Sequence, residues 1–162
     1  MKFANWESYA VPGHSPLRVV FSYTGATCST EGCERAEQVF DSARHGSGTG
    51  VRSGAPSGRQ LLYKAGSVCI DMHIQSKPGS DSLVLIGQLL DSERPGHGLR
   101  DVSVALLCEG DTISYQTTND FGEFDFGIET PHHLQLVFGI EQRRPLVVSM
   151  PDMQVDPWSA IT

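Results

Sequence analysis

One short stretch constrains the fold of this 162-residue chain more than any other. In residues 117–128, a β-rich run ends at a polar turn, Asn119-Asp120, and a second run leaves the turn in strict alternation. Such alternation is typical of a strand with one buried and one solvated face. The stretch therefore predicts a hairpin whose second strand packs one face on a core. The two faces of that strand are Phe124, Phe126 and Ile128 on one side and Glu123, Asp125 and Gly127 on the other.

The same β pattern recurs through the C-terminal two-thirds of the chain. Runs of five to nine residues alternate with turns that contain Gly, Pro, Asp or Ser, and no room is left for a crossover helix. We therefore predict an all-β, antiparallel β-sandwich of about seven strands over residues 59–151. The runs are Arg59–Lys64, Val68–Ile74, Leu83–Asp91, Val102–Cys108, Thr112–Thr118, Glu123–Ile128, Leu134–Ile140 and Leu146–Met150.

Two glycines in this region have predicted backbone roles. Gly87 interrupts a long apolar run, which indicates a bulge or a close approach of backbone. Gly110 lies in the turn Glu109-Gly-Asp111, where it can take a positive φ and close a hairpin.

The first 58 residues differ from the rest. Leu17–Tyr23 is a candidate strand, and Glu34–Arg44 is a candidate short helix with Ala36, Val39, Phe40 and Ala43 on one face. Residues 45–59 contain five glycines and three serines, a composition typical of a flexible linker or disordered loop. We therefore divide the chain into an N-terminal extension with linker (1–58), the sandwich (59–151) and a C-terminal tail (152–162).

The charge distribution limits the partners. Residues 1–58 carry five acidic and five basic side chains, whereas residues 59–162 carry fourteen acidic and seven basic ones, which accounts for the whole net charge of −7. An acidic surface disfavours nucleic acid and anionic membranes, because binding phosphates requires clustered Lys and Arg. No secretory signal or apolar stretch of about 20 residues is visible, so we expect a cytoplasmic protein with no membrane partner.

Residues 83–150 resemble the carboxypeptidase-regulatory-like, Cna-B-type domains, which are β-sandwiches of prealbumin (transthyretin-like) topology. The resemblance lies in three blocks that occur in order: Leu85–Asp91 with Gly87, Leu99–Leu106 with its Val-x-Val-x-Leu alternation, and Thr117–Phe124 with Thr118, Asp120, Gly122 and Phe124. It implies a Greek-key sandwich in which Thr118 and Asp120 form the turn, Gly122 permits it and Phe124 anchors the returning strand.

The resemblance does not extend to every property of that family. Surface adhesins with Cna-B domains often contain a Lys–Asn isopeptide bond, but lysine here is limited to Lys2, Lys64 and Lys77, and none pairs convincingly with a strand-end Asn. We therefore do not predict that bond. The run Arg59–Ile74 ahead of the sandwich is also similar to short cytoplasmic bacterial proteins encoded beside sigma-factor and anti-sigma genes.

Candidate metal and catalytic residues are weak. Cys28 and Cys33, flanked by His14 and His45, are the best metal candidates, but they lack the second ligand pair of a zinc site, and a disulfide or plain thiols are the alternatives. His132 and His133 are adjacent, so on a strand they point to opposite faces and cannot readily chelate one ion.

The remaining clusters are also better explained by structure. Asn119, Asp120, Glu123 and Asp125 concentrate oxygen ligands around one hairpin, without the spacing of a calcium loop. Gly46–Gly50 lacks the strand, helix and Lys of a phosphate loop. Cys69 and Cys108 fall in strand runs and are expected to be buried thiols. We therefore predict no catalytic residue and no cofactor.

The function expected from these observations is protein interaction without catalysis. An open sandwich has edge strands that can accept a strand from a partner or a second copy, and Leu17–Tyr23 is a candidate donor, within its own chain or swapped. Trp158 in the C-terminal tail either packs on the sandwich or docks a partner. Two alternatives stay open: a regulatory partner in a sigma/anti-sigma stress-response circuit, and a carbohydrate- or small-ligand-binding sandwich.

Overall fold

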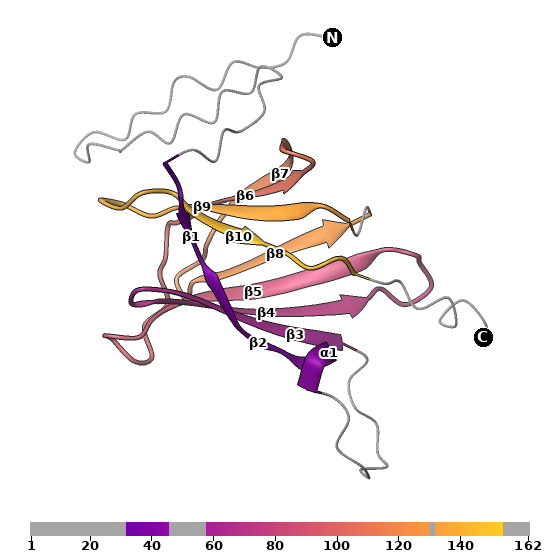
Figure 1. Cartoon of the computed structure of the whole chain (residues 1–162), viewed down its shortest axis with the longest axis horizontal. Coiled ribbons are helices and arrows are strands. Elements are labelled where there is room, and N and C mark those ends of the chain that lie inside the picture. The colour runs from indigo at the N-terminus through magenta and orange to yellow at the C-terminus, as the bar shows by residue number, and fades with distance from the viewer. Residues whose placement is uncertain (1–31, 46–57, 130–131, 154–162) are drawn as a thin grey trace, which may run out of the picture.

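The computed structural model describes residues 32–45, 58–129 and 132–153, which form two five-stranded β-sheets packed face to face (Figure 1). Sheet A has the order β1-β10-β9-β6-β7, and sheet B has the order β2-β3-β4-β5-β8. Neighbouring strands are antiparallel except β1 and β10, which are parallel, so sheet A is mixed and sheet B is antiparallel. The prediction of an all-β two-sheet sandwich is therefore confirmed.

From β3 to β10 the strands follow the predicted runs closely, with ends that differ by no more than two residues. In sheet A they are β1 (Glu34–Arg35), β10 (Leu146–Ser149), β9 (Leu134–Gly139), β6 (Ser103–Cys108) and β7 (Asp111–Thr117). In sheet B they are β2 (Glu37–Asp41), β3 (Gly58–Ala65), β4 (Val68–Ser76), β5 (Leu83–Asp91) and β8 (Glu123–Ile128). A four-residue helix, α1 (Ser42–His45), follows β2, and the described residues hold no helix long and apolar enough to cross a membrane.

The helix predicted over Glu34–Arg44 is wrong for most of its length. The segment forms β1 against sheet A and β2 against sheet B, and only its last residues enter α1. It changes sheets at Ala36, whose backbone N–H donates to the carbonyl of Val147 (2.9 Å). Both sheets offer edge hydrogen bonds to this segment, and such tertiary pairing overrides a local helix preference of a few tenths of a kcal/mol per residue.

The core lies between the two sheets and receives alternate residues from both. β5 and β8 show the expected alternation of buried and accessible positions, and the core-facing side chains of β6 and β9 are almost fully buried. The ring of Phe124 on β8 meets the ring of Phe138 on β9 edge-on, with centroids 5.4 Å apart. This contact between an aromatic of sheet B and one of sheet A joins the two layers.

The β6–β7 hairpin turn uses positive φ angles, as its sequence predicts. Glu109 (φ 53°) and Gly110 (φ 90°) are the two residues between Cys108 and Asp111, which pair directly, so both central residues of this β6–β7 turn are left-handed. That is the geometry of a type I′ turn, whose twist matches the flanking strands. The prediction of a hairpin with positive φ at Gly110 is confirmed.

Gly87 does not form a bulge; instead, the ring of Phe124 approaches it closely. The register of β5 with β4 and with β8 is continuous through Gly87, which pairs with Phe124. A Cβ added at Gly87 would clash with the ring of Phe124, so the glycine provides the space in which this ring lies. An aromatic residue placed across a strand from a glycine also covers the backbone that the glycine leaves bare.

Replacing Phe124 with Ala should lower the free energy of unfolding by about 3–5 kcal/mol, because it removes the ring that joins the sheets and fills the space over Gly87. Urea unfolding followed by circular dichroism measures this change. Phe121→Ala is the matched control, since Phe121 is 67% exposed and its loss should change stability by no more than about 0.5 kcal/mol. Equal effects of the two substitutions would contradict the core position of Phe124.

Candidate interaction edge

The turn between β7 and β8 is organised by two polar side chains. Thr118 is 3% exposed, and its hydroxyl accepts a hydrogen bond from the N–H of Val102 (2.9 Å) and donates one to the carbonyl of Leu99 (2.7 Å). Asn119 Oδ1 accepts the N–H groups of Phe121 (3.0 Å) and Glu123 (2.9 Å). These bonds fix the path of the chain from sheet A to sheet B.

Asn119, and not its neighbour Asp120, forms the hydrogen bonds of this turn. Its Nδ2 also donates to the Glu123 carboxylate (2.8 Å), whereas Asp120 is exposed at the tip. The sequence pattern pointed to Thr118 and Asp120 as the turn formers. Asn and Asp both bond to backbone two residues ahead, so the sequence alone does not distinguish two adjacent ones.

Gly122 and Gly98 allow two backbone segments to cross without side chains between them. Gly122 has φ 75°, and a Cβ there would overlap the carbonyl of Leu89. A Cβ at Gly98 would overlap the carbonyl of Phe121. The loop before β6 and the β7–β8 turn are thereby locked together at one end of the sandwich, which makes this turn a structural feature.

The candidate metal ligands do not converge among the described residues. No group of three or more His, Cys, Asp or Glu side chains in this part of the chain could hold a metal ion. Cys69 and Cys108 are free and only partly buried, and Cys33 is also partly buried. Cys28 and His14 lie outside the described residues. His132 and His133 are exposed at the start of β9.

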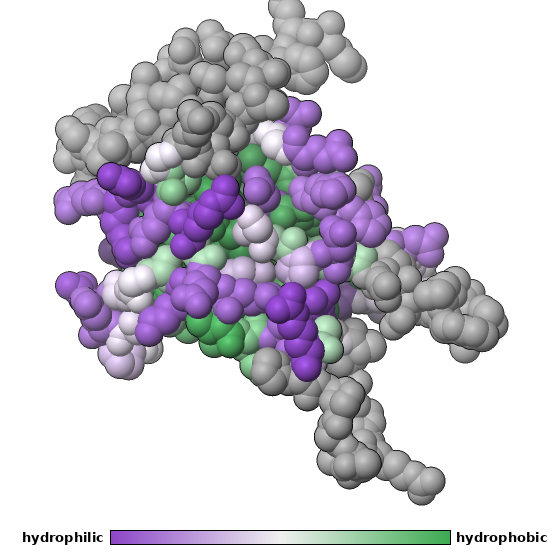
Figure 2. Space-filling model, in the orientation of Figure 1, coloured by the Kyte–Doolittle hydropathy of each residue, from purple (hydrophilic) through white to green (hydrophobic). Residues whose placement is uncertain are grey.

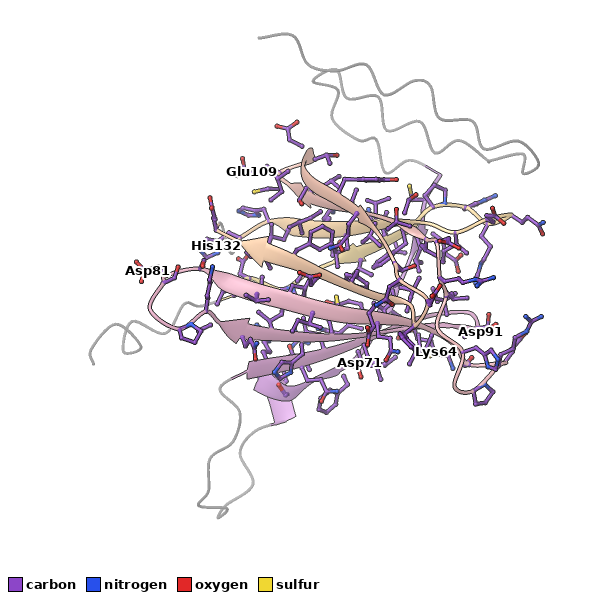
Figure 3. All side chains as sticks on the ribbon, turned by 180° about the vertical axis from the view of Figure 1, so that it is seen from behind. Lys64, Asp71, Asp81, Asp91, Glu109 and His132 are labelled. Atoms are coloured by element: carbon purple, nitrogen blue, oxygen red, sulfur yellow. The ribbon has the colours of Figure 1, made fainter. Side chains whose placement is uncertain are left out.

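Charged groups are likewise distributed over the two ends of the sandwich. Figure 3 shows Asp81, Glu109 and His132 toward one end, and Asp91 and Lys64 toward the other. Lys64 is exposed on β3, where it pairs with Glu37 of β2 and Cys69 of β4, and not with an Asn. In this part of the chain, these charges are arranged as a solvated surface.

A polar clamp that the sequence did not reveal lies where β2 and β3 begin to diverge. Asp41 is 2% exposed, and its carboxylate accepts two hydrogen bonds from the Arg59 guanidinium, Nε at 2.9 Å and Nη2 at 2.6 Å. Arg59 Nη1 also donates to the carbonyl of Asp152 (3.2 Å). The Tyr63 hydroxyl donates to the carbonyl of Ser149 (3.0 Å). The clamp therefore ties sheet B to the strand end of β10 and the residues that follow it.

The environment of the clamp shifts the pKa values of its members. The Arg59 hydrogen bond holds the pKa of Asp41 below its usual value, and the Asp41 carboxylate in turn raises the pKa of Arg59. Burial raises the pKa of Tyr63 to about 12. Asp41 is therefore ionised and Tyr63 neutral at physiological pH, the states in which they form these hydrogen bonds.

The sandwich has four edge strands among the described residues, and three of them carry features that hinder pairing with another chain. β1 has two residues, both charged. β2 has Glu37 and Asp41 at its ends and a register shift between Gln38 and Phe40. β8 exposes Glu123 and Asp125, and the Asp125 carbonyl accepts a hydrogen bond from the Gln116 side chain. Short length, charge and bulges are the usual protections of a sheet edge.

β7 also has a bulge, but it is the longest of the four edges and carries a single charge, Asp111 at its start, so it is the edge with the weakest protection. It is seven residues long and uncharged from Thr112 to Thr117, and it exposes Ile113 (48%) and Tyr115 (51%). Its pairing with β6 places Ser114 opposite Leu106 and Thr112 opposite Leu107, so Ile113 is the extra residue of a bulge. The Tyr115 hydroxyl donates a hydrogen bond to Ser103 Oγ on β6 (2.9 Å). β7 is thus a strand edge with apolar side chains presented to solvent.

Tyr63→Phe should remove part of the loss of stability at alkaline pH. Because the folded state raises the pKa of Tyr63 from 10 to about 12, its contribution is complete below pH 10 and is lost as pH rises toward 12. Urea unfolding at pH 8 and at pH 11 should show that the free energy of unfolding decreases less for the variant than for the wild type. An identical decrease in the variant and the wild type would contradict a buried neutral Tyr63.

Asp41→Asn should destabilise the protein by about 2–3 kcal/mol at pH 7, because it leaves the Arg59 charge without its carboxylate. The folded state lowers the pKa of Asp41, so this contribution is present above the unfolded pKa near 3.8 and disappears as pH falls below it. The difference between variant and wild type should therefore shrink in urea titrations between pH 7 and pH 3. Asp81→Asn, on the exposed β4–β5 turn, should have the wild-type free energy of unfolding at both pH values.

Comparison with known proteins assigns no family to this chain. Comparisons of the chain with protein-family models, with curated proteins and with solved structures each find no match. The chain is therefore described by its own architecture: an all-β sandwich of one mixed and one antiparallel five-stranded sheet, with one weakly protected edge at β7.

Proposed function

We propose that this protein is a non-enzymatic interaction module that self-associates by pairing its β7 edge with β7 of a second copy. The exposure of Ile113 and Tyr115 on an otherwise uncharged edge strand carries the proposal. Apolar side chains at the edge of a sheet add affinity when a second strand pairs with that edge.

The sequence of β7 suits antiparallel pairing with itself. If Ser114 lies on the two-fold axis, Ile113 of one copy faces Tyr115 of the other, and Asp111 faces Thr117. Aromatic and β-branched side chains are a favourable cross-strand pair, and no like charges are opposed. On β8 the same operation centred on Phe124 would oppose Glu123 to Asp125. The preference for β7 over β8 is therefore electrostatic as well as apolar.

The expected dimer is weak. One strand pair buries less than the roughly 1,200 Å² of a standard stable interface, and the bulge at Ile113 shortens the regular part of β7. A weak, isologous contact forms and dissociates with protein concentration. Self-association at this edge would let concentration control the state of the protein.

Two finer identifications are also proposed. We propose that residues 83–150 are a Greek-key sandwich of the carboxypeptidase-regulatory-like, Cna-B type, which is supported by the three sequence blocks falling on β5, on β6 and on the β7–β8 turn.

Membership in a sigma/anti-sigma circuit of the cytoplasm stays a prediction. Affinity purification of a tagged copy that recovers a sigma or anti-sigma factor would support it, and recovery of the untagged protein alone would favour self-association.

Ile113→Lys should abolish the dimer, because it replaces the apolar side chain that faces Tyr115 of the second copy with a charged one. Light scattering and sedimentation velocity over a range of concentrations should show a rising mass for the wild type and a constant monomer mass for the variant. Val39→Lys is the matched control, since Val39 is equally exposed (48%) but lies on the β2 edge. A wild type that stays monomeric at millimolar concentration, or a Val39→Lys variant that also loses the dimer, would rule out pairing through β7.

A further inference from the structure

The face of sheet A that points away from the core is apolar and buried. Ala105 and Leu107 of β6, Val137 of β9 and Val147 of β10 form a second hydrophobic cluster, and each is at most 1% exposed. Strand register places Ala105, Val137 and Val147 in one row across three neighbouring strands. This cluster is separate from the core between the sheets, so sheet A is buried on both faces and the molecule has two apolar layers instead of one.

The corresponding face of sheet B is built differently. Its rows combine polar and apolar side chains, such as Gln60, His73, Ile86 and Asp125 in one row and Leu62, Asp71, Gln88 and Glu123 in the next. Ile86 at the centre of this face is 44% exposed. Figure 2 shows hydrophilic residues over much of the described surface in its view. A mixed, open face is ordinary for a solvated sheet, whereas a fully buried apolar face requires a cover.

Among the described residues, the partly buried hydrophobic side chain that packs against this cluster is Cys33. Cys33 directly precedes β1, the edge strand of the same sheet, and the N–H of Glu34 donates to the carbonyl of Pro145 (2.8 Å). The 31 residues that precede Gly32 therefore join the described structure at the border of the buried face.

We propose that residues 17–23 of the same chain pack on this outer face of sheet A, with Leu17, Val19, Phe21 and Tyr23 directed at the cluster. These residues alternate with Arg18, Val20 and Ser22, so an extended segment presents one apolar face with period two. The apolar face of the segment matches an apolar sheet face that is three strands wide.

The length of the connection permits this placement. Nine residues, 24–32, separate the segment from Cys33 and can extend over about 30 Å. Five strands at their usual spacing are about 19 Å across. The segment can therefore reach any part of the face.

The other segments outside the described residues are attached elsewhere. Residues 46–57 connect α1 to β3 of sheet B. The C-terminal residues follow Met153, which is 3% exposed and belongs to the core between the sheets. Residues 130–131 are only two. The N-terminal segment is thus the part of the chain whose attachment and composition both fit the outer face of sheet A.

A thiol placed on the face tests the proposal in the full-length protein. Val137→Cys is nearly isosteric and should react slowly with iodoacetamide, as judged by mass spectrometry of its peptide. In the background Val19→Asp with Phe21→Asp, the Val137→Cys thiol should react about tenfold faster or more, because the cover is lost. Cys69, on the opposite sheet, is an internal control in the same molecules and should keep its rate.

The matched control is Val20→Asp with Ser22→Asp, which adds the same charge to the other face of the segment and should leave the Val137→Cys rate unchanged. Equal rates in all backgrounds, or equal acceleration by both double substitutions, would overturn the proposal. So would acceleration by simple dilution of the parent protein, because the cover would then be a second copy. Ile113→Lys should not change the reaction rate of the Val137→Cys thiol, which separates this inference from dimerisation at β7.

Discussion

The burial of one apolar face of each sheet against the other is the interaction on which the other features depend. Because side chains on a strand alternate, a slip of one residue would move every core side chain of that strand to the wrong face. The registers of β4, β5 and β8 are therefore fixed by core residues such as Ile70, Leu85 and Phe126, each of which is at most 3% exposed. The positions of the turns and edges follow from these registers.

The same constraint explains which parts of the fold could be predicted from sequence. From Arg59 onward, every strand except the accessible β7 records its burial as an alternation or a short apolar run that is visible without knowing its partners. Residues 34–41 were predicted as a helix because their role depends on two sheet edges that are built by residues far along the chain, such as Leu146 and Lys64. A local pattern does not contain that information.

The functional features were less accessible for a related reason. Asp41 and Arg59 are 18 residues apart and meet only because β2 pairs with β3, so neither residue stands out alone. The weakness of the β7 edge is likewise a comparison among four edges, and it requires the order of the strands. By contrast, the turn at Asn119 was within reach of the sequence, because a tight turn joins residues that are close in the chain. In the described part of the chain, its carboxylates do not form a group that could hold a metal ion.

The arrangement of sheet A links the two proposals geometrically. A two-fold axis through Ser114 and perpendicular to the sheet would join two copies of sheet A while keeping their outer faces on the same side. The two N-terminal segments would then lie on one surface of the joined sheet, and the two B sheets would lie together on the other. Since the strands of sheet B carry six acidic side chains and two basic ones, the B sheets would repel each other at low ionic strength, and salt would screen this repulsion. An interface formed through β7 is therefore expected to strengthen with salt, the opposite of one held by complementary charges.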